Sequence, residues 1–128
     1  MNIPTVLTGL LDAIEEVDLA RLRTLCSPEV LLRVPGSMTA DITSNAEGID
    51  AFCAWTTSIR KLCGVVRISP EKVLREGDEL MCVGTIWIER SPRDFRSPCS
   101  LSVSFKDSKI ASFFLLLDTF ALEQFRGD

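Results

Sequence analysis

Two residues have the type and the position to do chemistry, Asp118 and Arg33. Asp118 ends a run of five apolar residues, 113–117. A carboxylate there is partly desolvated, which raises its pKa toward that of a useful general base; alternatively, it caps an element or meets solvent at a strand end. Arg33 lies between Leu32 and Val34 in a strand-like run. Its guanidinium either faces solvent or enters a pocket, where it would hold an anionic or carbonyl group and pair with Asp118.

Three large aromatic residues could form the walls of an apolar cavity beside this pair: Trp55, Trp87 and Phe114. Aromatic side chains line many small-molecule pockets, although at such spacings they more often belong to the core. With Arg33 and Asp118 they make up the predicted ligand-binding set. Asp41, in a polar loop, either reaches the mouth of such a pocket or is a solvated acid.

The residue types that are missing exclude several kinds of site. The 128 residues contain no His and no Tyr. Nucleophile–His pairs, His-containing metal centres and a Tyr that stabilises an oxyanion are therefore excluded. The acidic residues show no spacing typical of a cation site, so we expect neither a metal nor a cofactor. The net charge is -4 and the basic residues are scattered, which argues against a nucleic acid partner.

The cysteines and the apolar runs indicate the cellular environment. The five cysteines form no CxxC pair, and an odd number at wide spacing predicts free, buried thiols. No run reaches the roughly 18 to 20 apolar residues that span a bilayer. The first residues lack the basic segment of a signal peptide. We therefore expect a soluble, cytoplasmic protein with no membrane partner.

The spacing of apolar residues predicts helices first and strands afterwards. Residues 6–17 repeat apolar side chains at helical spacing, and Asp18 is a good N-cap for a second, shorter helix. Residues 30–34 form a short β-rich run, and Ser44-x-x-Glu47 has the pattern of a capping box that starts a third helix. The later segments are typical of four strands in an antiparallel meander: 65–75, 79–90, 97–106 and 109–120.

The last of these strands is apolar on both faces. Phe114 and Leu116 alternate with Phe113, Leu115 and Leu117. Helices can cover one face of such a strand, but in so small a chain the second face needs another cover. A second copy is the simplest source, so we predict a homodimer through the sheet.

This order of elements resembles the cone-shaped fold of the nuclear transport factor 2-like superfamily, and more closely its SnoaL-like and ketosteroid isomerase-like branch. The resemblance implies one α+β domain over residues 1–128. Three N-terminal helices would pack on a curved, mostly antiparallel sheet, and a conical pocket would be lined by the concave face. The segments that carry the resemblance are 14–20, 28–36, Glu47-Gly48-Ile49 with Phe52, and 109–118.

The chemistry of the resembling families does not carry over intact. Arg33 stands where the ketosteroid isomerase-like branch has a carboxylate base, the His of SnoaL-type cyclases is absent, and the Asp-Arg-Asp group of the epoxide hydrolase branch is matched only by Asp118. We therefore expect a domain that binds a small hydrophobic molecule, held by Arg33 and Asp118. The alternative is an isomerase, hydratase or hydrolase of a carbonyl or epoxide compound, with Asp118 as base and Arg33 as electrophile.

A third hypothesis makes the chain a structural subunit whose cavity has collapsed. In that case no cavity larger than about 300 Å³ should lie near Arg33.

Overall fold

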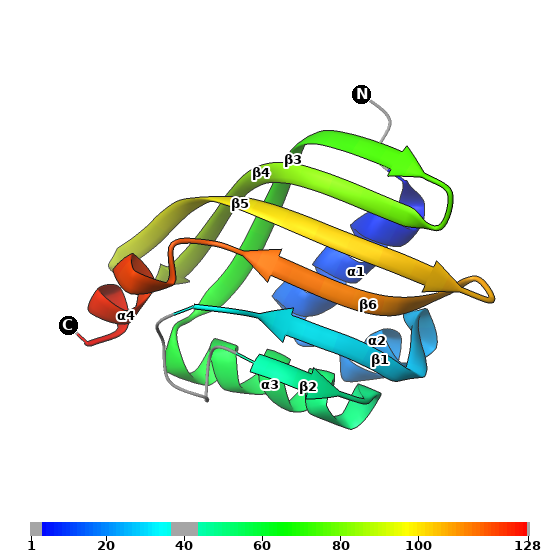
Figure 1. The fold of residues 1–128 in the computed structure, drawn as a ribbon. Coiled ribbons are helices and arrows are strands. Elements are labelled where there is room, and N and C mark those ends of the chain that lie inside the picture. Colours follow the sequence, from blue (N-terminus) through cyan, green and yellow to red (C-terminus); the bar gives the residue numbers. More distant parts are fainter. Residues whose placement is uncertain (1–3, 37–43, 128) are drawn as a thin grey trace.

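A curved, six-stranded sheet carries helices on one of its faces (Figure 1). The computed structural model describes residues 4–36 and 44–127. In this part of the chain the helices are α1 (Thr5–Glu16), α2 (Leu19–Leu25), α3 (Ile49–Leu62) and α4 (Thr119–Gly127). The strands are β1 (Cys26–Val34), β2 (Ser44–Glu47), β3 (Val65–Glu76), β4 (Glu79–Arg90), β5 (Arg93–Lys106) and β6 (Lys109–Leu116).

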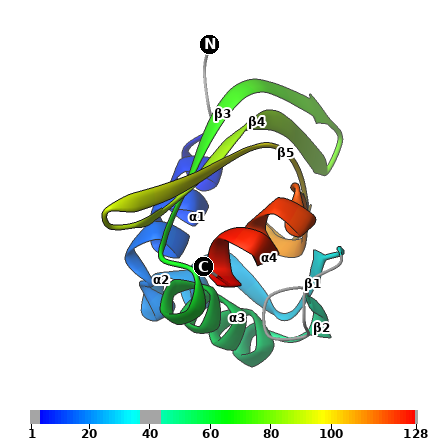
Figure 2. The ribbon, with the colours of Figure 1, turned by 90° about the vertical axis from the view of Figure 1, so that its left-hand side faces the viewer.

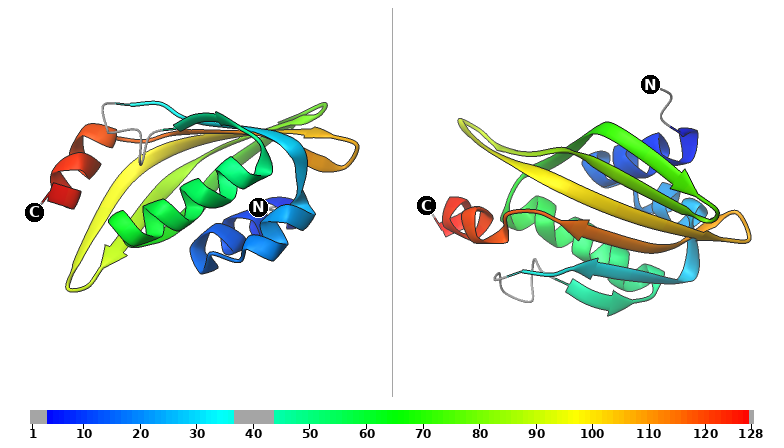
Figure 3. Two further views of the ribbon diagram at one scale, coloured as in Figure 1. Left: turned by 90° about the horizontal axis from the view of Figure 1, so that it is seen from below. Right: turned by 45° about the horizontal axis from the view of Figure 1, so that its top comes forward.

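The strand order is β2-β1-β6-β5-β4-β3, and neighbouring strands are antiparallel except for β1 and β6. The predicted α+β class and the curved, mostly antiparallel sheet are confirmed. Figure 3 shows α1, α2 and α3 on one side of the sheet and α4 at one end. We call the face toward α1 and α3 the inner face and the opposite one the outer face.

The first two helices form where the apolar spacing predicts them. α1 buries Leu7, Leu10 and Ile14 and ends at Val17, whose backbone is left-handed. The side chain of Asp18 accepts a hydrogen bond from the Arg21 N–H at 3.1 Å, which confirms Asp18 as the N-cap of α2.

The predicted capping box is wrong. Ser44–Glu47 is the strand β2, whose extended backbone pairs antiparallel with β1, so the segment forms a ladder rather than a helical turn. α3 begins at Ile49 without a side-chain cap. Gly48 precedes it with φ 104°, a conformation that glycine adopts readily, and this lets the chain turn directly from strand to helix.

The predicted last strand is too long, and the prediction of three helices misses a fourth. β6 ends at Leu116, and Asp118 then accepts the Ala121 N–H at 3.0 Å at the start of α4. α4 lies across one end of the layers (Figure 2), with Leu122 fully buried and the Phe125 ring 5.8 Å from the Phe95 ring. The side chain of Arg93 donates to the Phe125 carbonyl at 3.0 Å and holds the end of this helix.

Strands β4 and β6 show which side chains lie on the inner and which on the outer face of the sheet. On β4, Ile86 and Ile88 are fully buried on the inner face, whereas Met81 and Val83 are exposed on the outer face. On β6, Phe113 and Leu115 are fully buried, whereas Phe114 is half-buried and Leu116 is exposed. The helices therefore cover only the inner face of β6.

A bulge in β3 brings two backbones unusually close. One extra residue stands between Pro70 and Lys72, and the bulge lies opposite Gly84 of β4. A Cβ atom on Gly84 would lie 2.1 Å from the carbonyl oxygen of Ser69, so the strands can approach here only over a glycine.

Candidate functional site

Arg33 and Phe114 lie side by side on the outer face, because β1 and β6 are neighbours and these two residues are register partners. The guanidinium of Arg33 is exposed and Phe114 is half-buried. Within residues 4–36 and 44–127, no hydrogen-bond or ion-pair partner of Arg33 is found. The strand pattern contained the signal for this placement: Val30, Leu32 and Val34 are buried, so Arg33 must point to the other face.

Two hollows meet at this pair. The smaller one has a volume of about 300 Å³ and is lined by Arg33, Pro35, Asn45 and Phe114. The larger one has a volume of about 550 Å³, and its lining includes Arg33, Phe114, Leu31, Glu79, Ser102 and Ser112. Both hollows are open depressions of the outer face, whereas the conical pocket that the resemblance implies would be lined by the concave, inner face.

Ser102, which lines the larger hollow, belongs to a row of short side chains. Ser100, Ser102 and Ser104 of β5 share the outer face, and we call them the serine row. By register, Met81 and Phe114 flank Ser102, and Val83 and Leu116 flank Ser100. Ser100 and Ser102 thus lie between longer apolar side chains, whereas Ser104 lies between Glu79 and Ser112.

The three predicted aromatic residues do not share one cavity. Trp55 lies on the inner side, where its ring is 6.2 Å from that of Phe52 and 6.0 Å from that of Phe113. Trp87 and Phe114 are both on the outer face, but their partners on β5 are Arg96 and Ser102. Six residues of strand separate these partners, a distance of about 20 Å.

Asp118 acts as a helix cap in the structure. It is exposed, its carboxylate accepts the Ala121 N–H, and its own N–H donates to the buried Ser97 hydroxyl at 3.1 Å. In the described part of the chain no ion pair joins it to Arg33. Asp41 lies outside the described residues.

The interior between helices and sheet is filled by apolar side chains. Phe52 and Phe113 are fully buried, with ring centroids 5.1 Å apart. The buried polar side chains among the described residues are Thr56, Ser97 and Thr119. None of these is charged at neutral pH, so the described residues supply no strong acid or base to this interior.

The five cysteines are free and buried, which confirms the prediction of unpaired core thiols. Burial raises the pKa of Cys26 to about 12 and that of Cys63 and Cys99 to about 11. They are protonated at neutral pH and therefore poor nucleophiles.

Because of these thiols, the free energy of unfolding should depend on pH in the alkaline range. Their pKa values in the folded protein lie above the unfolded value of 9.0. The protonated thiols therefore make their full contribution to the free energy of unfolding below pH 9, and this contribution is lost as the pH rises toward 11 to 12. For Cys26 the full effect is about 4 kcal/mol. We expect the free energy of unfolding to fall over this range, and less steeply in Cys26→Ala. Thiolate absorbance can follow the titration directly because the chain has no Tyr; absorbance that rises below pH 9 in the folded protein would contradict this assignment.

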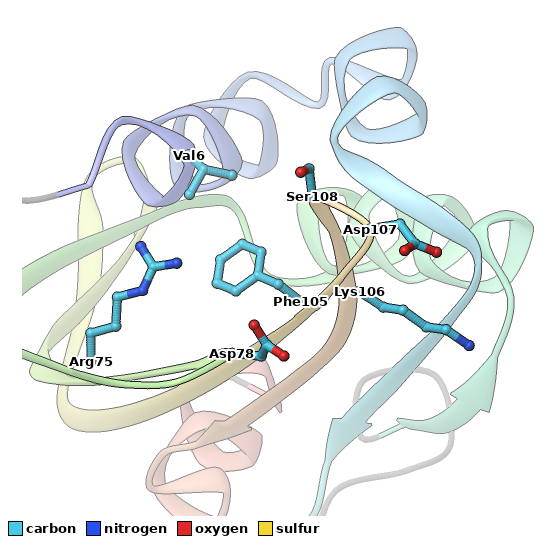
Figure 4. Close-up of a pocket in the computed structure, with 7 residues that line it drawn as sticks. All are labelled: Val6, Arg75, Asp78, Phe105, Lys106, Asp107 and Ser108. Carbon is cyan, nitrogen blue, oxygen red and sulfur yellow. The ribbon is translucent and has the colours of Figure 1, made fainter.

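Another hollow lies near the start of α1 and has a volume of about 290 Å³. Figure 4 shows Val6, Arg75 and Phe105 pointing toward one another, while Lys106 points away. The guanidinium carbon of Arg75 is 5.8 Å from the centre of the Phe105 ring, and Asp78 lines the same hollow. Arg75 thus already has an aromatic contact and an acidic neighbour, so Arg33 is the better candidate for binding a ligand.

Comparison with known proteins identifies related families and folds. A family model described as the SnoaL-like domain matches residues 7–113. No curated protein matches the chain significantly. In the described part of the chain, no helix has the length and apolar character that crossing a membrane requires.

Three solved structures share the fold at low sequence identity. A nuclear transport factor 2-like protein of unknown function from Burkholderia pseudomallei is 16% identical, with a TM-score of 0.84 over 96% of this chain and 95% of that chain. A protein with a ketosteroid isomerase-like fold from Catenulispora acidiphila, in complex with trimethylamine, is 16% identical, with a TM-score of 0.80 over 98% and 95%. IdmH from Streptomyces antibioticus, a proposed polyketide cyclase, is 16% identical, with a TM-score of 0.77 over 96% of each chain.

Proposed function

The chain belongs to the SnoaL-like domain family, and on this basis we propose that it binds a small hydrophobic molecule carrying a carboxylate. The observation that carries the proposal is the Arg33 guanidinium, which has no partner among the described residues and lies beside the Phe114 ring in two adjoining hollows. A guanidinium can bind a carboxylate through two parallel hydrogen bonds. The neighbouring ring offers an apolar surface to the rest of the ligand.

The two hollows differ in charge, and this orients the ligand. Besides Arg33, the described residues of the smaller hollow are uncharged, and Asn45 adds an amide beside the guanidinium. The larger hollow contains Glu79, which would repel a carboxylate. We therefore place the carboxylate of the ligand on the smaller side and its apolar body over Phe114.

A proton-transfer step is not part of this proposal. Asp118 caps α4, and the buried residues that the structure describes supply hydroxyl, thiol and apolar groups to the interior. Binding alone requires only the charge of Arg33 and the surface around it.

Replacement of Arg33 with methionine tests the ligand site. Naphthoate is a suitable probe, and naphthamide is its uncharged counterpart. At a hundredfold excess over Kd, naphthoate should stabilise the parent chain by about 2.7 kcal/mol in thermal unfolding. Losing a charged hydrogen bond of about 1.5–3 kcal/mol should weaken binding at least tenfold in Arg33→Met.

Arg96→Met is the matched control, because Arg96 lies on the same face over the Trp87 ring at 5.0 Å, far from the hollows. It should bind naphthoate like the parent. Equal binding of naphthoate and naphthamide, or unchanged binding in Arg33→Met, would remove Arg33 from the site.

We also propose that two copies pair through the outer face. Five large apolar side chains are exposed there by 43–61%, namely Leu31, Leu74, Met81, Val83 and Leu116. An exposed apolar patch of this kind is typical of an interaction surface. The expected mass in sedimentation at micromolar concentration is that of two chains.

The chemistry of this face favours a second copy as the partner. A two-fold interface uses the same surface on both subunits, so that surface must complement itself. Ser100 and Ser102 lie between longer apolar side chains, which lets the long side chains of one copy pack over the short ones of the other. Arg33 and Glu79, of opposite charge, are on the same face and could pair reciprocally between copies.

A further inference from the structure

A single chain gives the proposed ligand only a partial enclosure. Arg33 is exposed, and Leu31, which lines the larger hollow, is 46% exposed. Binding sites for small molecules usually bury 70–90% or more of the ligand surface. A molecule lying over Phe114 would contact protein on one side and water on the other, so a wall of the site is missing.

The apolar side chains of the outer face surround this open side. Leu31 lines the larger hollow itself, and Met81 and Phe114 are both register partners of Ser102. A second copy seated on these side chains would also cover the hollows, because the apolar patch and the hollows share residues. The contacts that form the dimer would therefore also close the site.

Closure places Arg33 in an environment with little water. A buried guanidinium without a counter-charge is unfavourable, so the dimer needs an acidic group beside it. Glu79 is the acidic residue among those described for the larger hollow. The smaller hollow has no acidic residue among its described lining residues, and the carboxylate of a ligand would supply the charge on that side.

From these observations we infer that the Arg33 site is shared by two copies, each closing the hollow of the other, so that carboxylate binding and dimerisation strengthen each other. This inference rests on the proposed ligand site and on the proposed dimer. Coupling of this kind is reciprocal: a ligand that strengthens the dimer binds the dimer more tightly by the same factor.

The dimer dissociation constant, measured by sedimentation over a dilution series, tests the coupling. Saturating naphthoate should lower this constant at least tenfold in the parent chain and in Arg96→Met, and naphthamide should not. Arg33→Met lacks the guanidinium that would bind the carboxylate, and its dimer dissociation constant is measured with and without the same probe. Naphthoate should then have no effect on it.

The reverse measurement uses a chain that cannot pair. Leu116→Glu changes an exposed residue outside the lining of both hollows. If it is monomeric, its naphthoate affinity should be at least tenfold weaker than that of the parent dimer. If the monomer and the dimer bind naphthoate with the same affinity, and this binding requires Arg33, the shared site is overturned. The proposed function would still stand. Absence of Arg33-dependent binding in any state would overturn both.

Discussion

Replacing Phe113 with alanine is expected to lower the free energy of unfolding by about 3–5 kcal/mol. The side chain is fully buried, and its ring contacts those of Phe52 and Trp55 between α3 and the sheet. The truncated side chain would leave a cavity that these large rings cannot easily fill. Domains of this size are stable by only about 5–15 kcal/mol, so the substitution should remove a large part of the stability. Urea denaturation followed by circular dichroism measures the change.

Phe114→Ala is the matched control, since it removes the same ring one position further along β6. Phe114 is half-buried on the outer face, and we expect its loss to cost about 1 kcal/mol. Its main effect should instead be weaker naphthoate binding. Equal destabilisation by the two substitutions would show that the two faces of β6 have been assigned incorrectly.

Leu116→Glu should prevent dimer formation and raise the dimer dissociation constant at least a hundredfold. Leu116 is 43% exposed within the proposed interface, beside Ser100. A two-fold interface contains the substitution twice, and each buried carboxylate would lack a partner. Sedimentation velocity over a dilution series gives the dissociation constant. Urea denaturation should show an almost unchanged monomer.

Phe120→Glu provides the control for added charge on an exposed apolar residue. Phe120 is 65% exposed, but it belongs to α4, away from the outer face. It should dimerise like the parent chain. If Leu116→Glu also dimerises like the parent, the outer face is not the interface.

Local sequence patterns were enough to predict the elements whose structure depends on residues close together in the sequence. The period of residues 6–17 predicted α1, and the side chain of Asp18 predicted the start of α2. Residues 97–106 were predicted as a strand, and β5 separates apolar from polar residues because only one of its faces is covered. These features, taken in order along the chain, were enough to predict the α+β fold.

Other features depend on contacts between distant segments. Ser44 and Glu47 have the spacing of a capping box, and only pairing with β1 makes the segment a strand. The carboxylate of Asp118 could equally have been a desolvated base, and the Ala121 N–H makes it a cap. The serine row gains significance only from the long side chains that adjacent strands place on either side of it.

The bulge in β3 has an evolutionary consequence. It reverses the alternation of the strand, so that Ile68 and Val73 both lie on the inner face, whereas Leu74 is turned outward. The bulge also requires glycine at position 84. Relatives should therefore inherit the two together: a sequence with a larger residue at that position should be one residue shorter in its third strand.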